Sequence, residues 1–249
     1  KKNVLLTADN GANLNRARED VLEALVRYKF RRLSCSIDGA SQKTYSIYRV
    51  KGNFDNVIAN IRTLNAFKKK YNSPYPLLQW QYVAFGHNEH EIGNARAMAE
   101  ELGMKFYLKL NWDGLYTTAF STVNDQELIR RETGLGVADR KEYEEKFGRH
   151  FAGPTCHQLW LAPRINFDGK LLGCSINHWG NYGNVFEHGL SACLTGEKME
   201  YAKQMVLGWR EAKEGIPCAY CKVYRSMKER DAFVRPEDLA IPYIEGRQM

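Results

Sequence analysis

The sequence predicts an α/β protein, in which part of a (βα) barrel is followed by a small cysteine-rich α+β domain. Across residues 1–112, short apolar runs alternate with amphipathic stretches of helical length. Strands separated by such helices pair in parallel through right-handed crossovers. From residue 151 onward this alternation ends, and cysteine, tryptophan, glycine and asparagine become frequent. The alternation in the first part also fits a doubly wound sheet, which remains the second architecture.

Each element in the first part is predicted from its apolar spacing and its end signals. Apolar or β-branched runs predict strands at 3–7, 33–37, 77–85 and 106–110. Amphipathic spacing predicts helices at 18–28, 41–48, 54–69 and 89–102. The helix at 54–69 has the clearest apolar stripe, and Ser41 is a suitable N-cap for the helix at 41–48.

The predicted strands end in polar or glycine-rich segments. These segments are 7–11, 36–39, 86–88 and 111–113. Ligands of parallel α/β proteins collect at the carboxyl ends of the strands. The sequence therefore predicts a binding rim at this edge of the sheet.

The remaining sequence divides into a bridge and a second domain. Residues 113–150 lack strand character and contain polar helical stretches at 125–132 and 139–147. We therefore predict a partial barrel at 1–112, a bridging segment at 113–150 and an auxiliary domain at 151–249. In the last of these, a hairpin is expected around Asp168-Gly169 and a helix at 197–209.

Composition indicates a globular protein of the cytoplasm. Among 249 residues, 44% are hydrophobic and 26% are charged, and no apolar run is long enough to span a membrane. The net charge of +7 suits an anionic partner, but the basic residues are scattered, which makes nucleic acid an unexpected partner. Six cysteines in a chain of this length favour a reducing compartment over a secreted disulfide scaffold.

Four cysteines in the last third form a candidate metal-ligand set. Cys156 and Cys174 enclose Gly169, and Cys218 and Cys221 form a Cys-x2-Cys pair. Gathered thiolates select zinc or an iron–sulfur cluster. The other two cysteines, at positions 35 and 193, lie in apolar surroundings and are interpreted as structural.

The strand-end motifs and the cysteines, taken in order, resemble one enzyme family. The motifs are Thr7-Ala8-Asp9-Asn10-Gly11, Ser36-Ile37-Asp38-Gly39-Ala40-Ser41 with Tyr45, Tyr48 and Arg49, Asn88-Glu89-His90-Glu91-Ile92, and Cys156…Gly169…Cys174. Together they resemble the radical S-adenosylmethionine (radical SAM) superfamily with a C-terminal auxiliary iron–sulfur domain of the SPASM/Twitch type. The likeness extends from residue 3 to about residue 225.

The resemblance implies cofactors and residues that hold them. An auxiliary [4Fe–4S] cluster is implied at Cys156, Cys174, Cys218 and Cys221. The implied S-adenosylmethionine site contains Ser36, Asp38 and Asn10. In the same site Arg49 reaches the ligand's carboxylate, to which a guanidinium can bind in bidentate fashion.

The resemblance also implies the chemistry of the intact enzyme. A second [4Fe–4S] cluster would cleave S-adenosylmethionine to a radical that abstracts hydrogen from substrate, and the auxiliary cluster would accept an electron. The substrate could be a peptide, a sugar or another molecule. The expected electron donor is a small redox protein such as a flavodoxin or ferredoxin.

Two departures from the family pattern bear on function. The chain contains no Cys-x3-Cys-x2-Cys triplet and no Gly-Gly-Glu segment. We expect both to precede residue 1 and this chain to be inactive by itself. Secondly, no cysteine follows Cys221, whereas a full SPASM domain continues with further cysteines, so the chain resembles the smaller Twitch variant. No residue is assigned a catalytic role. The alternative function is a non-catalytic binding or scaffold module in which the four cysteines hold a structural zinc ion.

Overall fold

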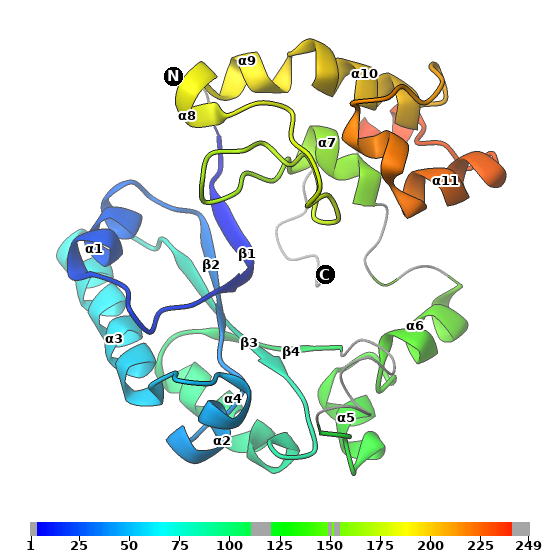
Figure 1. Ribbon diagram of the computed structural model, residues 1–249. Coiled ribbons are helices and arrows are strands. Elements are labelled where there is room, and N and C mark those ends of the chain that lie inside the picture. Colours follow the sequence, from blue (N-terminus) through cyan, green and yellow to red (C-terminus); the bar gives the residue numbers. More distant parts are fainter. Residues whose placement is uncertain (1–3, 111–120, 149–150, 152–154, 241–249) are drawn as a thin grey trace. The chain divides into compact units, whose positions relative to one another are not determined.

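The chain folds into two compact units. The structure is a computed structural model that describes residues 4–110, 121–148, 151 and 155–240 (Figure 1). The units comprise Lys1–Arg149 and His150–Met249, and each has its own hydrophobic core. In the part of the chain that the structure describes, no helix combines the length and apolar character needed to cross a membrane.

The first unit is built on a parallel sheet. Its strands β1 (Thr7–Ala12), β2 (Arg32–Ser36), β3 (Leu77–Val83) and β4 (Lys105–Lys109) follow one another in space in their sequence order. Each neighbouring pair is parallel. A doubly wound sheet reverses its strand order at a switch point, whereas strands of a βα barrel follow in sequence. The described order therefore favours part of a barrel.

Helices cover one face of this sheet. They are α1 (Glu19–Arg27), α2 (Gln42–Tyr48), α3 (Phe54–Lys70) and α4 (Ile92–Glu101), the last preceded by the short turn η1 (Glu89–Glu91). Figure 1 shows α1, α3 and α4 on the same side of the strands. Val26, Ile61 and Leu64 from these helices are buried in one core with Cys35 and Trp80 from the strands.

The predicted helices and the three later strands are present in the first unit, with ends shifted by a few residues. The predicted strand at 3–7 is wrong, because β1 begins at Thr7. Val4, Leu5 and Leu6 suggested a buried strand, but their exposed fractions are 49%, 60% and 53%. Pairing with β2 is made by backbone groups, which do not require apolar side chains, so the polar run that follows forms the strand.

The helices predicted in residues 113–150 belong to the first unit. They are α5 (Gln126–Glu132) and α6 (Arg140–Phe147). The carboxylate of Asp125 accepts a hydrogen bond from the Leu128 amide, and that of Asp139 accepts one from the Glu142 amide. Both helices therefore begin at aspartate N-caps, as residue preferences predict.

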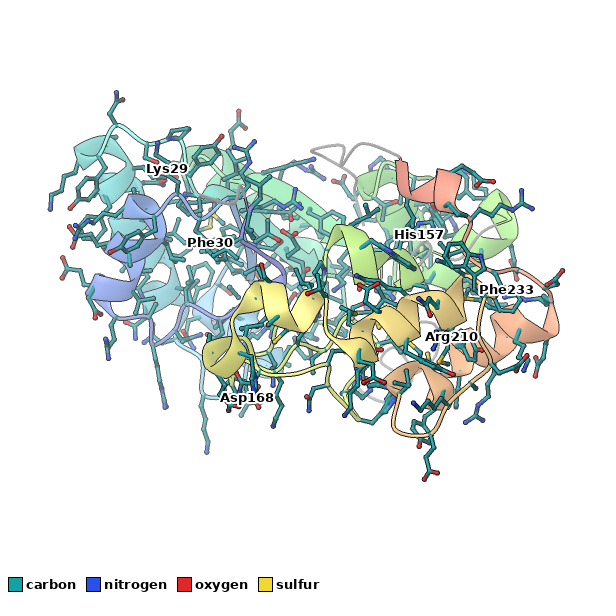
Figure 2. All side chains as sticks on the ribbon, turned by 90° about the horizontal axis from the view of Figure 1, so that it is seen from above. Lys29, Phe30, His157, Asp168, Arg210 and Phe233 are labelled. Carbon is teal, nitrogen blue, oxygen red and sulfur yellow. The ribbon has the colours of Figure 1, made fainter. Side chains whose placement is uncertain are left out.

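The second unit is helical, with little sheet. Its helices are α7 (Gln158–Leu161), α8 (Val185–His188), α9 (Leu190–Leu194), α10 (Glu197–Val206) and α11 (Lys222–Glu229), with short 3₁₀ turns η2 (Thr155–His157), η3 (Pro217–Tyr220) and η4 (Pro236–Ala240). Leu159, Leu171 and Met205 are buried at its centre. Phe233 packs over Gly208, just beyond α10 (Figure 2).

The predicted hairpin around Asp168-Gly169 is a turn with isolated bridges. Ile165 and Leu171 form an antiparallel bridge, and no longer strand is present there among the described residues. Gly169 has a φ of +84°, and a Cβ atom at this position would lie 2.2 Å from Asn184 Oδ1. Glycine is therefore required at this turn for both conformation and space.

Candidate functional site

The sheet of the first unit has one apolar and one polar face. In β2, Leu33 and Cys35 join the core beneath the helices. Because side chains alternate along a strand, Arg32, Ser34 and Ser36 lie on the opposite face. Parallel sheets are usually apolar on both faces. The exception here indicates that the second face serves a purpose other than forming a second core.

Side chains on the polar face are linked across the strands. Arg32 donates to both carboxylate oxygens of Asp9, at 2.6 and 2.8 Å. The Ser34 hydroxyl donates to Gln79 Oε1 at 2.6 Å. One strand layer further, Gln81 donates to Ser36 Oγ at 3.3 Å. The strand register places Lys105, Tyr107 and Lys109 of β4 on this same face.

The carboxyl end of this face is closely packed around Ser36. Gly11 of β1 approaches it so nearly that a Cβ on Gly11 would lie 2.0 Å from Ser36 Oγ. Gly11 also has a φ of +96°, which favours glycine. Asn10, next to it in β1, is exposed. The structure thus brings Ser36 and the Asn10-Gly11 strand end to one edge of the sheet.

Asp38 and Arg49 form an ion pair beside this edge. Asp38 is fully buried, and its Oδ2 accepts from Arg49 Nη2 at 2.5 Å and from Nε at 2.7 Å. Its other oxygen, Oδ1, accepts from the Val83 amide at 2.7 Å. Burial raises the pKa of the Asp38 carboxyl, while Arg49 and the amide oppose that rise. Both oxygens of Asp38 are thus used in holding Arg49 and β3.

Two side chains from the loop after β3 hold the loop after β2. The Asn88 amide donates to the carbonyls of Asp38, at 3.1 Å, and Val83, at 3.0 Å, and its oxygen accepts from the Phe85 amide. Glu91 accepts from the Ala40 amide and from the Ser41 hydroxyl, both at 2.7 Å. Asn88 and Glu91 thus join the loop after β3 to the loop after β2.

The four predicted cysteine ligands lie in one neighbourhood of the second unit. Cys156, Cys174, Cys218 and Cys221 are all free thiols. They are partly or fully buried, and burial raises the pKa of Cys156 above its ordinary value, with further contributions from the three other thiols. The pKa of Cys218 rises to about 11, again mainly through burial. Cys221 belongs to the second core, and Cys156 and Cys218 pack against it, so the fold gathers segments far apart in sequence.

The spacing of the four thiols bears on which metal they suit. Four thiolates around one zinc ion stand about 3.8 Å from one another, because each Zn–S bond is about 2.3 Å. Among the described residues, no three Cys, His, Asp or Glu side chains are arranged to hold a single metal ion. A [4Fe–4S] cluster binds one thiolate per iron, so its ligands stand farther apart. The described residues thus show four free thiols and no arrangement for a single ion.

Other buried side chains contact the thiols. The Tyr182 hydroxyl lies 3.1 Å from Cys218 Sγ, and Cys156 Sγ donates to the Met227 sulfur at 3.4 Å. The Trp179 indole donates to the Pro217 carbonyl at 2.9 Å, which braces the η3 turn that carries Cys218. The sequence identified the cysteines by their spacing. It gave no signal for Met227, because that residue stands at no motif position.

Comparison with known proteins yields structural likeness only. No family model matches the chain, and no curated protein matches it significantly. A solved structure of native anSMEcpe with bound AdoMet and Kp18Cys peptide is similar over 87% of this chain and 64% of that one, at 14% identity and a TM-score of 0.43. Native anSMEcpe with bound AdoMet matches at 13% identity and the same TM-score, over 87% and 63%. The chain therefore spans less than two thirds of these structures' length.

Proposed function

We propose that this chain is part of an iron–sulfur oxidoreductase or modifying enzyme of the radical SAM type. In this proposal Cys156, Cys174, Cys218 and Cys221 hold an auxiliary [4Fe–4S] cluster. The observation that carries it is the gathering of four free thiols that are close enough to affect one another's protonation. Four thiolates also suit zinc, and the Gly169-x4-Cys174 spacing together with the upstream strand-end motifs supports a cluster over zinc.

The second unit's residues would control how such a cluster exchanges electrons. A bound [4Fe–4S] cluster supplies a one-electron acceptor. Burial of the thiols limits access of water, and Met227 and Tyr182 contact two of the sulfurs. With four protein ligands the cluster would have no open position for substrate. Its proposed task is therefore electron transfer, with a flavodoxin or ferredoxin as the proposed electron donor of the intact enzyme.

In the first unit we propose that S-adenosylmethionine binds at the carboxyl end of the polar face. Ser36 and Asn10 would contact the ligand there. Arg49 would bind its carboxylate, and 27% of the Arg49 side chain is exposed while it pairs with Asp38. Asp38 would orient Arg49, since its oxygens are occupied by that residue and by Val83. Intact S-adenosylmethionine is polar and suits this face, because the side chains of the face donate and accept hydrogen bonds.

The charge of the chain supports an anionic substrate. The net charge is +7, and Lys105 and Lys109 lie on the polar face of the sheet. This positive charge would attract a peptide or sugar that bears carboxylate or phosphate groups. The reaction on that substrate and the intact enzyme's second [4Fe–4S] cluster are parts of the same proposal.

Metal analysis of protein purified without oxygen tests the function directly. We expect about four irons and four sulfides per chain. One zinc and no iron would contradict the proposal and support the scaffold alternative.

Ligand replacement identifies the cysteines that hold the metal. C218S and C221S should lose the iron and unfold the second unit, because ligation and folding are coupled in thiolate sites. C193A is the matched control, since Cys193 is buried in the same core but outside the group of four. Full iron content in C218S or C221S, measured beside the melting curve, would remove that residue from the ligand set.

A further inference from the structure

Tyr182 is a buried tyrosine whose hydroxyl meets one of the four sulfurs. Its exposed fraction is 4%, and its oxygen lies 3.1 Å from Cys218 Sγ. In the free thiol either atom could be the donor. A metal-bound thiolate has no proton and can only accept, so the hydroxyl must then donate. Metal binding would thus fix the direction of this hydrogen bond.

The position of Tyr182 is set by the fold. Its amide donates to the Leu171 carbonyl at 2.8 Å, and the Leu171 amide donates to the Gly183 carbonyl at 2.8 Å. Its ring packs against Gly173, where a Cβ atom would lie 2.7 Å from the ring. A donor held by backbone pairing and by a required glycine needs little reorganisation when the sulfur changes charge.

A hydrogen bond to a ligand sulfur affects the two redox states of a cluster unequally. Reduction adds negative charge that spreads onto the sulfurs, and a hydrogen bond to the more negative acceptor is stronger. Hydrogen bonds to the sulfurs are among the factors that set cluster potentials. The Tyr182 hydroxyl should therefore stabilise the reduced state and raise the potential.

We infer that Tyr182 donates a hydrogen bond to the Cys218 thiolate and so tunes the reduction potential of the auxiliary cluster. This inference rests on the proposed function. Tyr182 is a positioning residue in this inference, because its hydroxyl contacts the sulfur of a cluster ligand while the cysteines bind the irons. Its effect is on the equilibrium of electron transfer, independent of which substrate the enzyme modifies.

The test is Y182F in the full chain, with Y224F as matched control. Tyr224 is buried in the same core, and its hydroxyl makes no hydrogen bond to any of the four described thiols. Redox titration followed by the visible spectrum should show the Y182F potential lowered by about 59 mV, which is a tenfold shift in the one-electron equilibrium. Iron and sulfide content should stay unchanged, and Y224F should keep the wild-type potential.

A second variant keeps the ring and changes only the donor. A fluorinated tyrosine at position 182 is a stronger hydrogen-bond donor and should raise the potential, opposite to Y182F. Equal potentials in all these proteins, with iron and sulfide intact, would overturn the role of Tyr182 and leave the proposed function standing. Zinc in place of iron in the wild-type protein would overturn both.

Discussion

The negative charge of Glu91 has a structural role. The residue is nearly buried, and its carboxylate accepts from the Ala40 amide and the Ser41 hydroxyl. Burial alone would raise the pKa of Glu91, but these hydrogen bonds outweigh it and the pKa lies below its ordinary value. The ionised form therefore stabilises the loop between β2 and α2, the same loop that carries Asp38.

We expect E91Q to lower the free energy of unfolding by about 1–3 kcal/mol at neutral pH. The glutamine replaces one accepting oxygen by an NH2 group, which would face the hydrogen-bond donors of Ala40 and Ser41. The folded state binds fewer protons than the unfolded chain near the ordinary pKa of 4.5, so the contribution of Glu91 is full above that value. It is lost as pH falls through the lower folded pKa. Urea unfolding at several pH values should show the two proteins converging in acid.

The control for this variant is E101Q. Glu101 is exposed at the end of α4, the helix that Glu91 precedes, and should tolerate the change within about 0.5 kcal/mol. A difference between E91Q and wild type that stays constant down to strongly acidic pH would contradict the role given to the ionised carboxylate.

Arg49 is predicted to act on stability as well as on ligand binding. R49A should lower the free energy of unfolding by about 3 kcal/mol, because it leaves the buried Asp38 carboxylate without its partner. D38N combined with R49A should cost less than the two single changes added together, as expected for contacting residues. Additive losses in denaturant unfolding would show that the ion pair carries no coupling energy.

At the scale of elements, replacing each of two glycines by alanine should change stability in opposite directions. G169A should destabilise the second unit by about 1–3 kcal/mol, because the turn has a φ of +84° and the added Cβ would meet Asn184 and Phe186. G93A should instead stabilise the first unit by about 0.5–1 kcal/mol, because Gly93 lies within α4 with open space around it. Thermal unfolding of both variants measures the pair, and a stabilising G169A would show that the turn relaxes freely.

The elements differ in how well the sequence predicts them. The stripe that begins at Phe54 and the cap at Ser41 predicted α3 and α2, because spacing and capping act within a few residues. The first strand was misplaced, since Val4–Leu6 carry an apolar signal while pairing partners for the following residues come from β2. The hairpin at Gly169 was predicted from its turn and is present only as isolated bridges.

For the whole molecule, metal removal should affect one unit and spare the other. Each unit has a separate core, and all four cysteines of the proposed cluster belong to the second. Removing the metal should lower hydrogen-exchange protection around Leu171 and Met205, while protection of β2 and α3 stays unchanged. Equal loss of protection in both units would show that the two cores unfold as one.

The alternation of helices and strands, the polar strand ends and the four candidate cysteine ligands can all be predicted from the sequence. These features depend on local spacing and on residue chemistry, which can be read along the chain. The tertiary structure decided which side chains meet: Asp38 with Arg49, Glu91 with Ser41, and Tyr182 with Cys218. Such contacts join residues from different elements, and their partners are set by sheet register and packing, which local sequence does not encode.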